Sequence, residues 1–307
     1  MSSTPPVTKK THFEEAFYSH RWKKYHWTML DNTFLPDARG EMDAIIANRG
    51  IDPATNIKFR REFLGEMIYD EDLIVYSGYK TTANPLLNPT GVIGGIDYGM
   101  RDYFSIVLLA YNKSQATGEV IYEFKKKGLL FSEIVQAVTD AYHFGKNYCI
   151  KHNLSLNFKF YADSANPMET QTLYSEYKLP VWPCYKYAKV SAIQQLADFM
   201  KRGIITIPQD GALADECDQI IWKSDDQGNK VLELDDDYYH EDIVASLRYA
   251  FRQWCYECNL TVAETDSQPV IPKKKPAQDK FKEDVSQHTK IELSTIPKIK
   301  MEKNRHK

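Results

Sequence analysis

The spacing of hydrophobic and polar positions changes at about residue 91 of the chain. From that point short apolar runs alternate with turn residues, a pattern typical of strands. The runs GVIGGIDY (91–98), FSIVLLAY (104–111) and EVIYEF (119–124) therefore predict three strands. The turn-rich stretch KSQATG separates the last two, so we expect a three-strand meander.

Helical spacing follows this meander. Ser132 is a good N-cap for a helix that begins there. The apolar face of that helix consists of Ile134, Val135, Val138 and Tyr142. The run FKFYAD (158–163) predicts a fourth strand, and a short helix is expected after Pro167. PVWPCY (180–185) predicts a fifth strand, at a sheet edge because proline cannot donate to the hydrogen-bond ladder.

Three further elements complete the pattern. Apolar positions over 193–200 predict an amphipathic helix that ends at Gly203, and IITIP (204–208) follows as a short strand. The last helix runs from about Glu241 to Trp254. Since helices and strands now alternate, we expect parallel pairing. Three antiparallel strands followed by parallel strands, in the order 3-2-1-4-5 with flanking helices, make a mixed α/β sheet that resembles the RNase H-like fold.

The first ninety residues are different, because they mix aromatic and charged residues and predict helical stretches but no sheet. We expect residues 1–58 to be the end of one domain and 59–90 to be a linker to the sheet domain over 91–260. Residues 261–307 hold scattered apolar residues, prolines and many lysines, which cannot repay the entropy of ordering. They predict a disordered basic tail.

Composition narrows the class of protein. The chain has 307 residues, a net charge of −3 and five cysteines, and an odd cysteine count argues against a disulfide framework. Cys255 and Cys258 form a lone CxxC without the second ligand pair that a zinc site needs. A bilayer-spanning run and a signal-peptide pattern are both lacking, so we expect a cytoplasmic protein without a membrane partner. Because residues 1–261 are acidic overall, nucleic acid would have to meet local basic clusters.

Three carboxylates lie where the predicted elements should meet. Asp97 ends the first strand, Asp163 ends the fourth, and Asp242 begins the last helix. Converging carboxylates repel one another unless a cation neutralises them, and Mg²⁺ or Mn²⁺ suits oxygen ligands. Two such ions about 3.5–4 Å apart would clamp a scissile phosphate for hydrolysis. We expect Asp97 to bridge both ions, and Asp163 and Asp242 to complete one each.

Each acid also has a simpler interpretation. Asp97 or Asp163 alone could form a turn or cap a helix, and Asp242 could pair with the helix dipole. Glu241 stands next to Asp242 and is an alternative metal ligand or a cap, so the main ligand of the two is left open. His240 either orients water and the acids or faces solvent.

At this point the motifs resemble those of the phage terminase large subunit, a DNA-packaging motor with an ATPase domain followed by an RNase H-like nuclease. GIDYG (95–99), YADSANP (161–167) and HEDIVASLRYA (240–250) follow the order of the nuclease motifs of that family. The resemblance implies metal-ligand roles for Asp97, Asp163 and Asp242. It also implies that Lys189, at a helix start in YAKVSAIQQL, contacts phosphate, although a solvated lysine fits equally.

The resemblance extends upstream over roughly residues 2–258, through STPPVTKKTHF, HWTMLDNTFLP and FRREFLGE. One departure is large, because the chain contains no GxxxxGK[ST] phosphate loop and no apolar strand ending in paired acids before residue 90. The chain therefore resembles the C-terminal portion of such a motor, without its ATP site. The resemblance implies double-stranded DNA, the portal protein and the small terminase subunit as partners, a separate ATPase polypeptide where the motor is split, and the host cytoplasm as location.

Contacts to DNA are expected from scattered cations rather than from a recognition helix, because a packaging nuclease needs little base readout. The expected phosphate contacts are Arg101, Lys186, Lys189, Lys201 and Arg202. The lysine run 125–127 is a further candidate for a DNA contact, although such a run is more typical of a solvated strand end. The KKK at 273–275 fits a loose DNA contact or a solubilising tail.

Two alternative functions remain. IDYG also resembles the first phosphate loop of actin-like and sugar-kinase ATPases, but residues 91–260 are too short for the duplicated domain that those enzymes need. A non-catalytic module that docks onto the portal, the ATPase half or the small subunit, or that binds DNA, is the stronger alternative to metal-dependent DNA cleavage.

Overall fold

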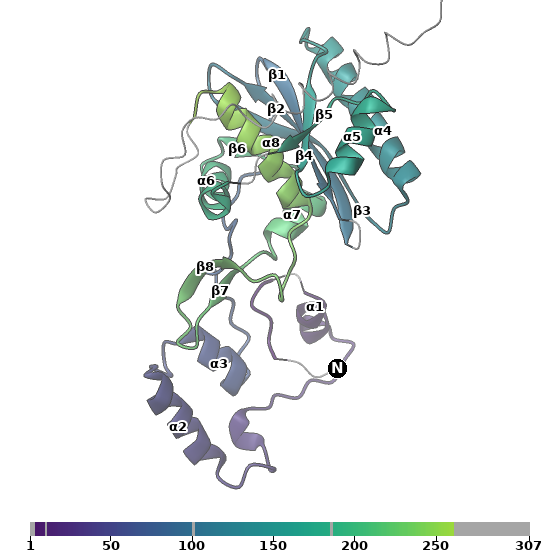
Figure 1. Cartoon of the computed structure of the whole chain (residues 1–307). Helices are drawn as coiled ribbons and strands as arrows, with labels where there is room; N and C mark the ends of the chain where they lie inside the picture. The colour runs from purple at the N-terminus through teal and green to yellow at the C-terminus, as the bar shows by residue number, and fades with distance from the viewer. Residues whose placement is uncertain (1–3, 10, 100–101, 185–186, 261–307) are drawn as a thin grey trace, which may run out of the picture.

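The computed structural model describes residues 4–9, 11–99, 102–184 and 187–260. Its main feature is a six-stranded sheet with the order β5-β4-β1-β2-β3-β6 (Figure 1). The strands are β1 (Gly91–Tyr98), β2 (Tyr103–Asn112), β3 (Thr117–Lys127), β4 (Lys159–Asp163), β5 (Val181–Cys184) and β6 (Ile205–Thr206). The predicted tail at 261–307 lies outside the described residues.

The pairing confirms the mixed sheet and its RNase H-like order. β1, β2 and β3 pair antiparallel, whereas β4 pairs parallel with β1 and β5 pairs parallel with β4. The proline-containing β5 lies at the sheet edge, as predicted. β6 pairs parallel with β3 and extends the other edge, a position that the sequence pattern did not specify.

Helices cover both faces of the sheet. α4 (Phe131–Lys151) and α5 (Pro167–Ser175) lie on one face, and α6 (Lys189–Lys201), α7 (Ala212–Cys217) and α8 (Ile243–Glu257) lie on the other (Figure 1). Alternate residues of β1 contribute to the two cores, with Val92 and Ile96 on the α4 side and Ile93 on the α8 side. Because side chains alternate along a strand, Asp97 lies on the α8 side of the sheet.

α8 packs against the sheet at unusually short range. A Cβ added at Gly95 would lie 1.8 Å from the backbone oxygen of Ser246, so only glycine permits this approach. The hydroxyls of Ser105 on β2 and Ser246 on α8 are 2.7 Å apart, and Ser105 also donates to the backbone oxygen of Asp242 at 3.0 Å. These contacts fix the start of α8 over the ends of β1 and β2.

The start of α4 differs from the prediction. The helix begins at Phe131, and the Glu133 carboxylate accepts the backbone N–H of Leu130 at 2.8 Å. Ser132 therefore lies inside the first turn and is not the N-cap. Serine favours the N-cap position, but here the contact of Glu133 with the backbone N–H of Leu130 caps the helix instead.

A smaller group of elements lies beyond the sheet, at the lower end of Figure 1. It consists of α1 (His12–Tyr18), η1 (Met29–Asp31), α2 (Ala38–Arg49), α3 (Ile57–Leu64) and the hairpin of β7 (Trp222–Ser224) and β8 (Lys230–Leu234). The hairpin was not predicted. Met42, Ile51 and Phe59 form a small separate core there.

The segment expected as a linker, residues 59–90, contributes Leu73, Val75 and Tyr76 to the core on the α8 side. An isolated antiparallel β-bridge between Ile74 and Ile221 joins this segment to the residue directly before β7. The proposed domain boundaries stay predictions.

Among the described residues, no helix combines the length and the apolar character required to span a bilayer.

Candidate active site

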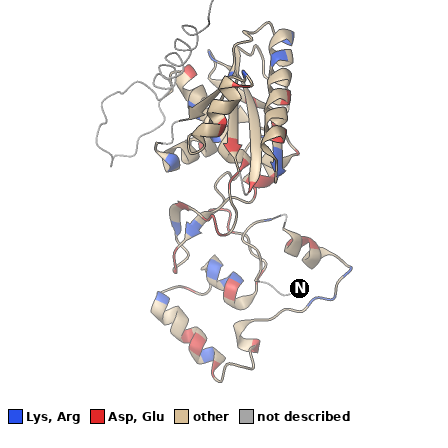
Figure 2. Ribbon diagram, turned by 45° about the vertical axis from the view of Figure 1, so that its right-hand side comes forward, with Lys and Arg blue, Asp and Glu red and all other residues tan. Residues whose placement is uncertain are grey.

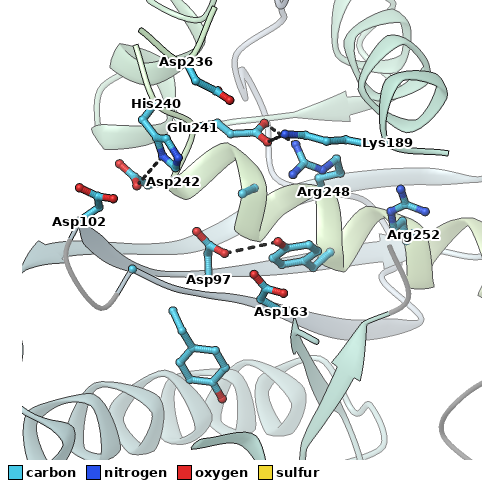
Figure 3. A pocket seen from close by; sticks show the side chains of 14 residues that line it. Asp97, Asp102, Asp163, Lys189, Asp236, His240, Glu241, Asp242, Arg248 and Arg252 are labelled. Atoms are coloured by element: carbon cyan, nitrogen blue, oxygen red, sulfur yellow. Dashed lines mark hydrogen bonds and ion pairs between the residues drawn. The ribbon is translucent and has the colours of Figure 1, made fainter. Parts of the chain in front are cut away.

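A cleft of about 400 Å³ opens where β1 and β4 end beside the start of α8. Its lining includes most of the predicted site residues that the structure describes: Asp97, Asp163, Lys189, His240, Glu241 and Asp242 (Figure 3). Asp102, Asp236, Arg248, Tyr249 and Arg252 line it as well. The topology thus brings together carboxylates that are far apart in sequence.

Asp97 and Asp163 follow the last paired positions of adjacent parallel strands, since Ile96 is in register with Ala162. Burial, and next the charge of Asp163, raise the pKa of the Asp97 carboxyl to about 7. The Asp163 carboxylate accepts the backbone N–H of Ala165 at 2.7 Å, so it also stabilises the turn after β4. Asp163 therefore stabilises a turn, as its simpler interpretation predicts, and it also lines the cleft.

Asp242 occupies the N-cap position of α8, but its side chain makes no capping hydrogen bond. Its side chain is almost completely buried, and Oδ2 lies 2.9 Å from the Lys125 ammonium. Oδ1 lies 3.5 Å from Nδ1 of His240 and has no hydrogen-bond partner in the described part of the chain. One oxygen of Asp242 is thus committed to an internal ion pair with Lys125, and the other makes no hydrogen bond within the described residues.

Glu216, on α7, performs the capping that Asp242 does not. Its fully buried carboxylate accepts the backbone N–H groups of Asp242, Ile243 and Val244 at 2.7, 3.2 and 2.9 Å. The same carboxylate lies 2.6 Å from the Lys125 ammonium. The sequence analysis missed Glu216, because no local pattern marks a cap that comes from 26 residues upstream.

Lys125 corrects the expectation that the run 125–127 is a solvated strand end. Only 10% of its side chain is exposed, and its ammonium bridges Glu216 and Asp242. Although burial opposes the charge, these two carboxylates keep the pKa of Lys125 above its ordinary value. Lys126 and Lys127 are exposed, so the expectation holds for the end of the run.

Glu241 lies in a different electrostatic setting from Asp242. It is buried, contacts the guanidinium of Arg248, and lies 3.0 Å from the Lys189 ammonium. Burial raises the pKa of Glu241, but the charges of Arg248 and Lys189 outweigh it, and the pKa falls below its ordinary value. Glu241 is therefore held as an anion between two cations, whereas Lys189 remains half exposed to the cleft.

Two of the other predicted phosphate contacts, Lys201 and Arg202, do not line the cleft. Lys201 and Arg202 lie at the opposite end of α6 from Lys189, and Arg202 pairs with Asp198 at 3.1 Å. Arg101 and Lys186 lie outside the described residues. In the view of Figure 2, Lys and Arg are scattered among Asp and Glu along the helices.

The donor chemistry of the cleft fits a hard divalent cation, because Asp97, Asp163 and Asp242 offer carboxylate oxygens, and Oδ1 of Asp242 has no hydrogen-bond partner among the described residues. Within the described ranges, however, no group of three or more His, Cys, Asp or Glu side chains is arranged to hold a metal ion as it stands. The carboxylates would have to draw together around a cation.

The five cysteines are all free thiols.

Comparisons with known proteins find solved structures whose fold resembles part of this chain. No protein-family model matches the chain, and no curated protein matches it. Solved structures similar to it include the large terminase nuclease domain of bacteriophage SPP1 with bound Mn, at 17% identity and a TM-score of 0.44, over 58% of this chain and 97% of that one. The nuclease of the large terminase of thermophilic phage G20c with bound magnesium is similar at 19% identity and a TM-score of 0.40, over 59% of this chain and 97% of that one.

A longer similar structure is a large terminase from another thermophilic bacteriophage, in complex with ADP, at 14% identity and a TM-score of 0.44. The match covers 73% of this chain and 54% of that one, so the chain spans about half the length of that terminase. At these identities and TM-scores the likeness does not assign a function to any residue. The roles of the site residues depend on their own contacts.

Proposed function

We propose that this chain carries a metal-dependent DNA endonuclease site that hydrolyses phosphodiester bonds, and that it serves the DNA-cutting step of a phage packaging terminase. The observation that carries the proposal is the crowding of acids in one cleft. Asp97 and Asp163 share it with the partly unpartnered Asp242, and the pKa of Asp97 is raised to about 7. Crowded carboxylates repel one another, and a divalent cation would relieve that repulsion.

In this proposal Asp97, Asp163 and Asp242 hold two Mg²⁺ or Mn²⁺ ions, with Glu241 as a supporting acid. When bound, the ions would lower the pKa of the attacking water and neutralise charge on the phosphate. Lys125 and Glu216 position Asp242 at the start of α8. Lys189 directs a half-exposed ammonium into the cleft for a phosphate oxygen, and His240 orients the Asp242 carboxylate.

The wider setting of the proposal is that of a packaging motor. The substrate would be concatemeric double-stranded DNA in the host cytoplasm, and the partners would be the portal protein, the small terminase subunit and a separate ATPase polypeptide. The motif order GIDYG, YADSANP and HEDIVASLRYA supports this setting.

Plasmid nicking in Mn²⁺ and in Mg²⁺ tests the proposed reaction. We expect Asp97→Asn to abolish nicking while its circular dichroism spectrum stays that of the wild type. Asp43→Asn, an exposed residue of α2 far from the cleft, is the matched control and should nick normally. Nicking by Asp97→Asn at the wild-type rate would refute the assignment.

A second candidate is a DNA-binding or docking module without catalysis. One observation favours it, because internal cations already neutralise two of the acids: Lys125 contacts Asp242, and Arg248 contacts Glu241. This candidate predicts that the wild-type protein binds DNA in Mn²⁺ without nicking it.

A further inference from the structure

Arg252 lies on α8, one turn after Arg248, and lines the same cleft as the acids (Figure 3). Its polar contacts are few. Nη2 donates to the backbone oxygen of Ala188 at 3.4 Å, and the guanidinium lies 5.2 Å from the ring centre of Tyr187. Nη1 is buried and has no hydrogen-bond partner among the residues that the structure describes.

The neighbouring Arg248 makes the contrast clear. Arg248 is buried against the Glu241 carboxylate, which balances its charge. Arg252 forms no ion pair with any carboxylate in the described ranges, and burial lowers its pKa from the ordinary value. A buried N–H group without an acceptor is unfavourable, and no contact in the described part of the chain satisfies Nη1 of Arg252.

The cleft is also divided by charge along its length. Asp97, Asp102 and Asp242 lie toward one side in Figure 3, whereas Lys189 and Arg252 lie toward the other. Lys189 begins α6 directly after Ala188, the residue that Arg252 contacts. Two cations from different helices therefore lie on the same side of the cleft, and the Lys189 ammonium is 3.0 Å from the Glu241 carboxylate.

We propose that Arg252 binds a phosphodiester of the DNA strand, next to the scissile one and on the α6 side of the acids. A phosphate offers the charge and the two acceptor oxygens to which a planar guanidinium fork donates best. The proposal rests on the proposed nuclease function and adds a phosphate subsite to it. With this contact the strand lies along α8, from the acids toward α6.

Binding of a short duplex DNA in Ca²⁺, measured over a range of salt concentrations, tests this subsite apart from cleavage. Arg252→Gln should weaken binding about tenfold and reduce the slope of log K against log salt by about 0.9, the value for one phosphate contact. Arg252→Lys keeps the charge and should recover the slope but only part of the affinity. Arg39→Gln, exposed on α2, is the matched control and should bind as the wild type does.

Thermal unfolding separates binding from a structural role. Since the guanidinium has a buried Nη1 without an acceptor and no carboxylate partner among the described residues, the melting temperature of Arg252→Gln should equal or exceed that of the wild type. A lower melting temperature with an unchanged salt slope would overturn the subsite and make Arg252 a structural residue.

The outcomes also separate the subsite from the nuclease. If the wild type nicks DNA but Arg252→Gln binds with the wild-type slope, the subsite is overturned and the nuclease stands. If the wild type binds DNA without nicking and Arg252→Gln shows the reduced slope, the nuclease is overturned and the phosphate subsite stands. If the wild type does not bind DNA, both are overturned.

Discussion

The Glu216 carboxylate accepts the backbone N–H of Asp242 at 2.7 Å, and this contact decides what Asp242 can do. A carboxylate at an N-cap position usually bonds the free N–H groups of its own helix. Here Glu216 satisfies those groups from α7, and Lys125 holds both carboxylates. Oδ1 of Asp242 thereby makes no hydrogen bond to the helix backbone and lies 3.5 Å from Nδ1 of His240.

Replacing Glu216 should therefore affect both stability and the cleft. Glu216→Ala removes the cap from three N–H groups and one of the two partners of Lys125, which should lower the free energy of unfolding by about 2–4 kcal/mol. Urea denaturation measures this loss. Asp242 should then turn to cap α8 or to pair more closely with Lys125, so Mn²⁺-dependent nicking should fall even where the variant is fully folded.

Glu233→Ala is the matched control, because Glu233 forms an ion pair with Lys223 that is exposed on both sides. Its loss should change the free energy of unfolding by less than about 1 kcal/mol. Equal stability of the two variants would contradict the capping role of Glu216.

The raised pKa of Asp97 predicts a pH-dependent gain in stability for Asp97→Asn. The folded carboxyl has a pKa of about 7, against an ordinary value of 3.8, so the folded state keeps a proton that the unfolded state has lost. The contribution of Asp97 to stability therefore falls as pH rises from about 4 to about 7. Across this pH window the free energy of unfolding of the variant should rise relative to that of the wild type by a few kcal/mol. The largest rise expected is about 4 kcal/mol.

Urea denaturation of Asp97→Asn and the wild type at several pH values, without divalent ions, measures this difference. Asp43→Asn controls for the change in net charge. A stability difference that stays flat between pH 4 and pH 8 would show that Asp97 does not carry the raised pKa.

Local patterns were sufficient to predict the sheet, because its strands are apolar runs whose connections allow only a few pairings. The order 3-2-1-4-5 and the edge position of β5 followed from run length, turns and prolines. The hairpin of β7 and β8 was missed because β7 has three residues and most of β8 is exposed, so neither shows an apolar strand pattern.

The candidate site was predictable only where a residue stands at the end of a strand or the start of a helix. Asp97, Asp163 and Asp242 occupy such positions, and the cleft contains all three. Glu216 and Arg252 were missed, because their importance comes from tertiary contacts with Asp242 and Ala188 that no spacing reveals. Lys125 was misread because a lysine run is usually solvated, whereas here the first lysine of the run meets two buried carboxylates.

The close approach of β1 and α8 predicts that Gly95→Ala is strongly destabilising. The added Cβ would lie 1.8 Å from the backbone oxygen of Ser246 and 3.0 Å from the backbone nitrogen of Ala250, and backbone atoms cannot swing aside. We expect a loss of about 3 kcal/mol or more in the free energy of unfolding. Because α8 would have to move, nicking by the folded fraction should fall as well.

Gly118→Ala is the matched control within the same sheet. The nearest atom to its added Cβ is the flexible end of Leu109, at 3.1 Å, so a loss of about 1 kcal/mol is expected. If Gly95→Ala were as stable as Gly118→Ala, α8 would not pack on β1 as closely as described.

Glu241 and Asp242 are adjacent, and their contacts predict opposite effects on stability and on metal binding. Glu241→Gln leaves the buried Arg248 without an anionic partner, so it should lower the free energy of unfolding by about 3 kcal/mol and leave the Mn²⁺-induced rise in melting temperature intact. Asp242→Asn leaves Lys125 paired with Glu216, so its stability without metal should change by less than about 1 kcal/mol. The same variant loses a carboxylate that lines the cleft, and Mn²⁺ should no longer raise its melting temperature. The reverse pattern would make Glu241 the principal metal ligand, because the metal would then have displaced Arg248 and Lys189 from its carboxylate.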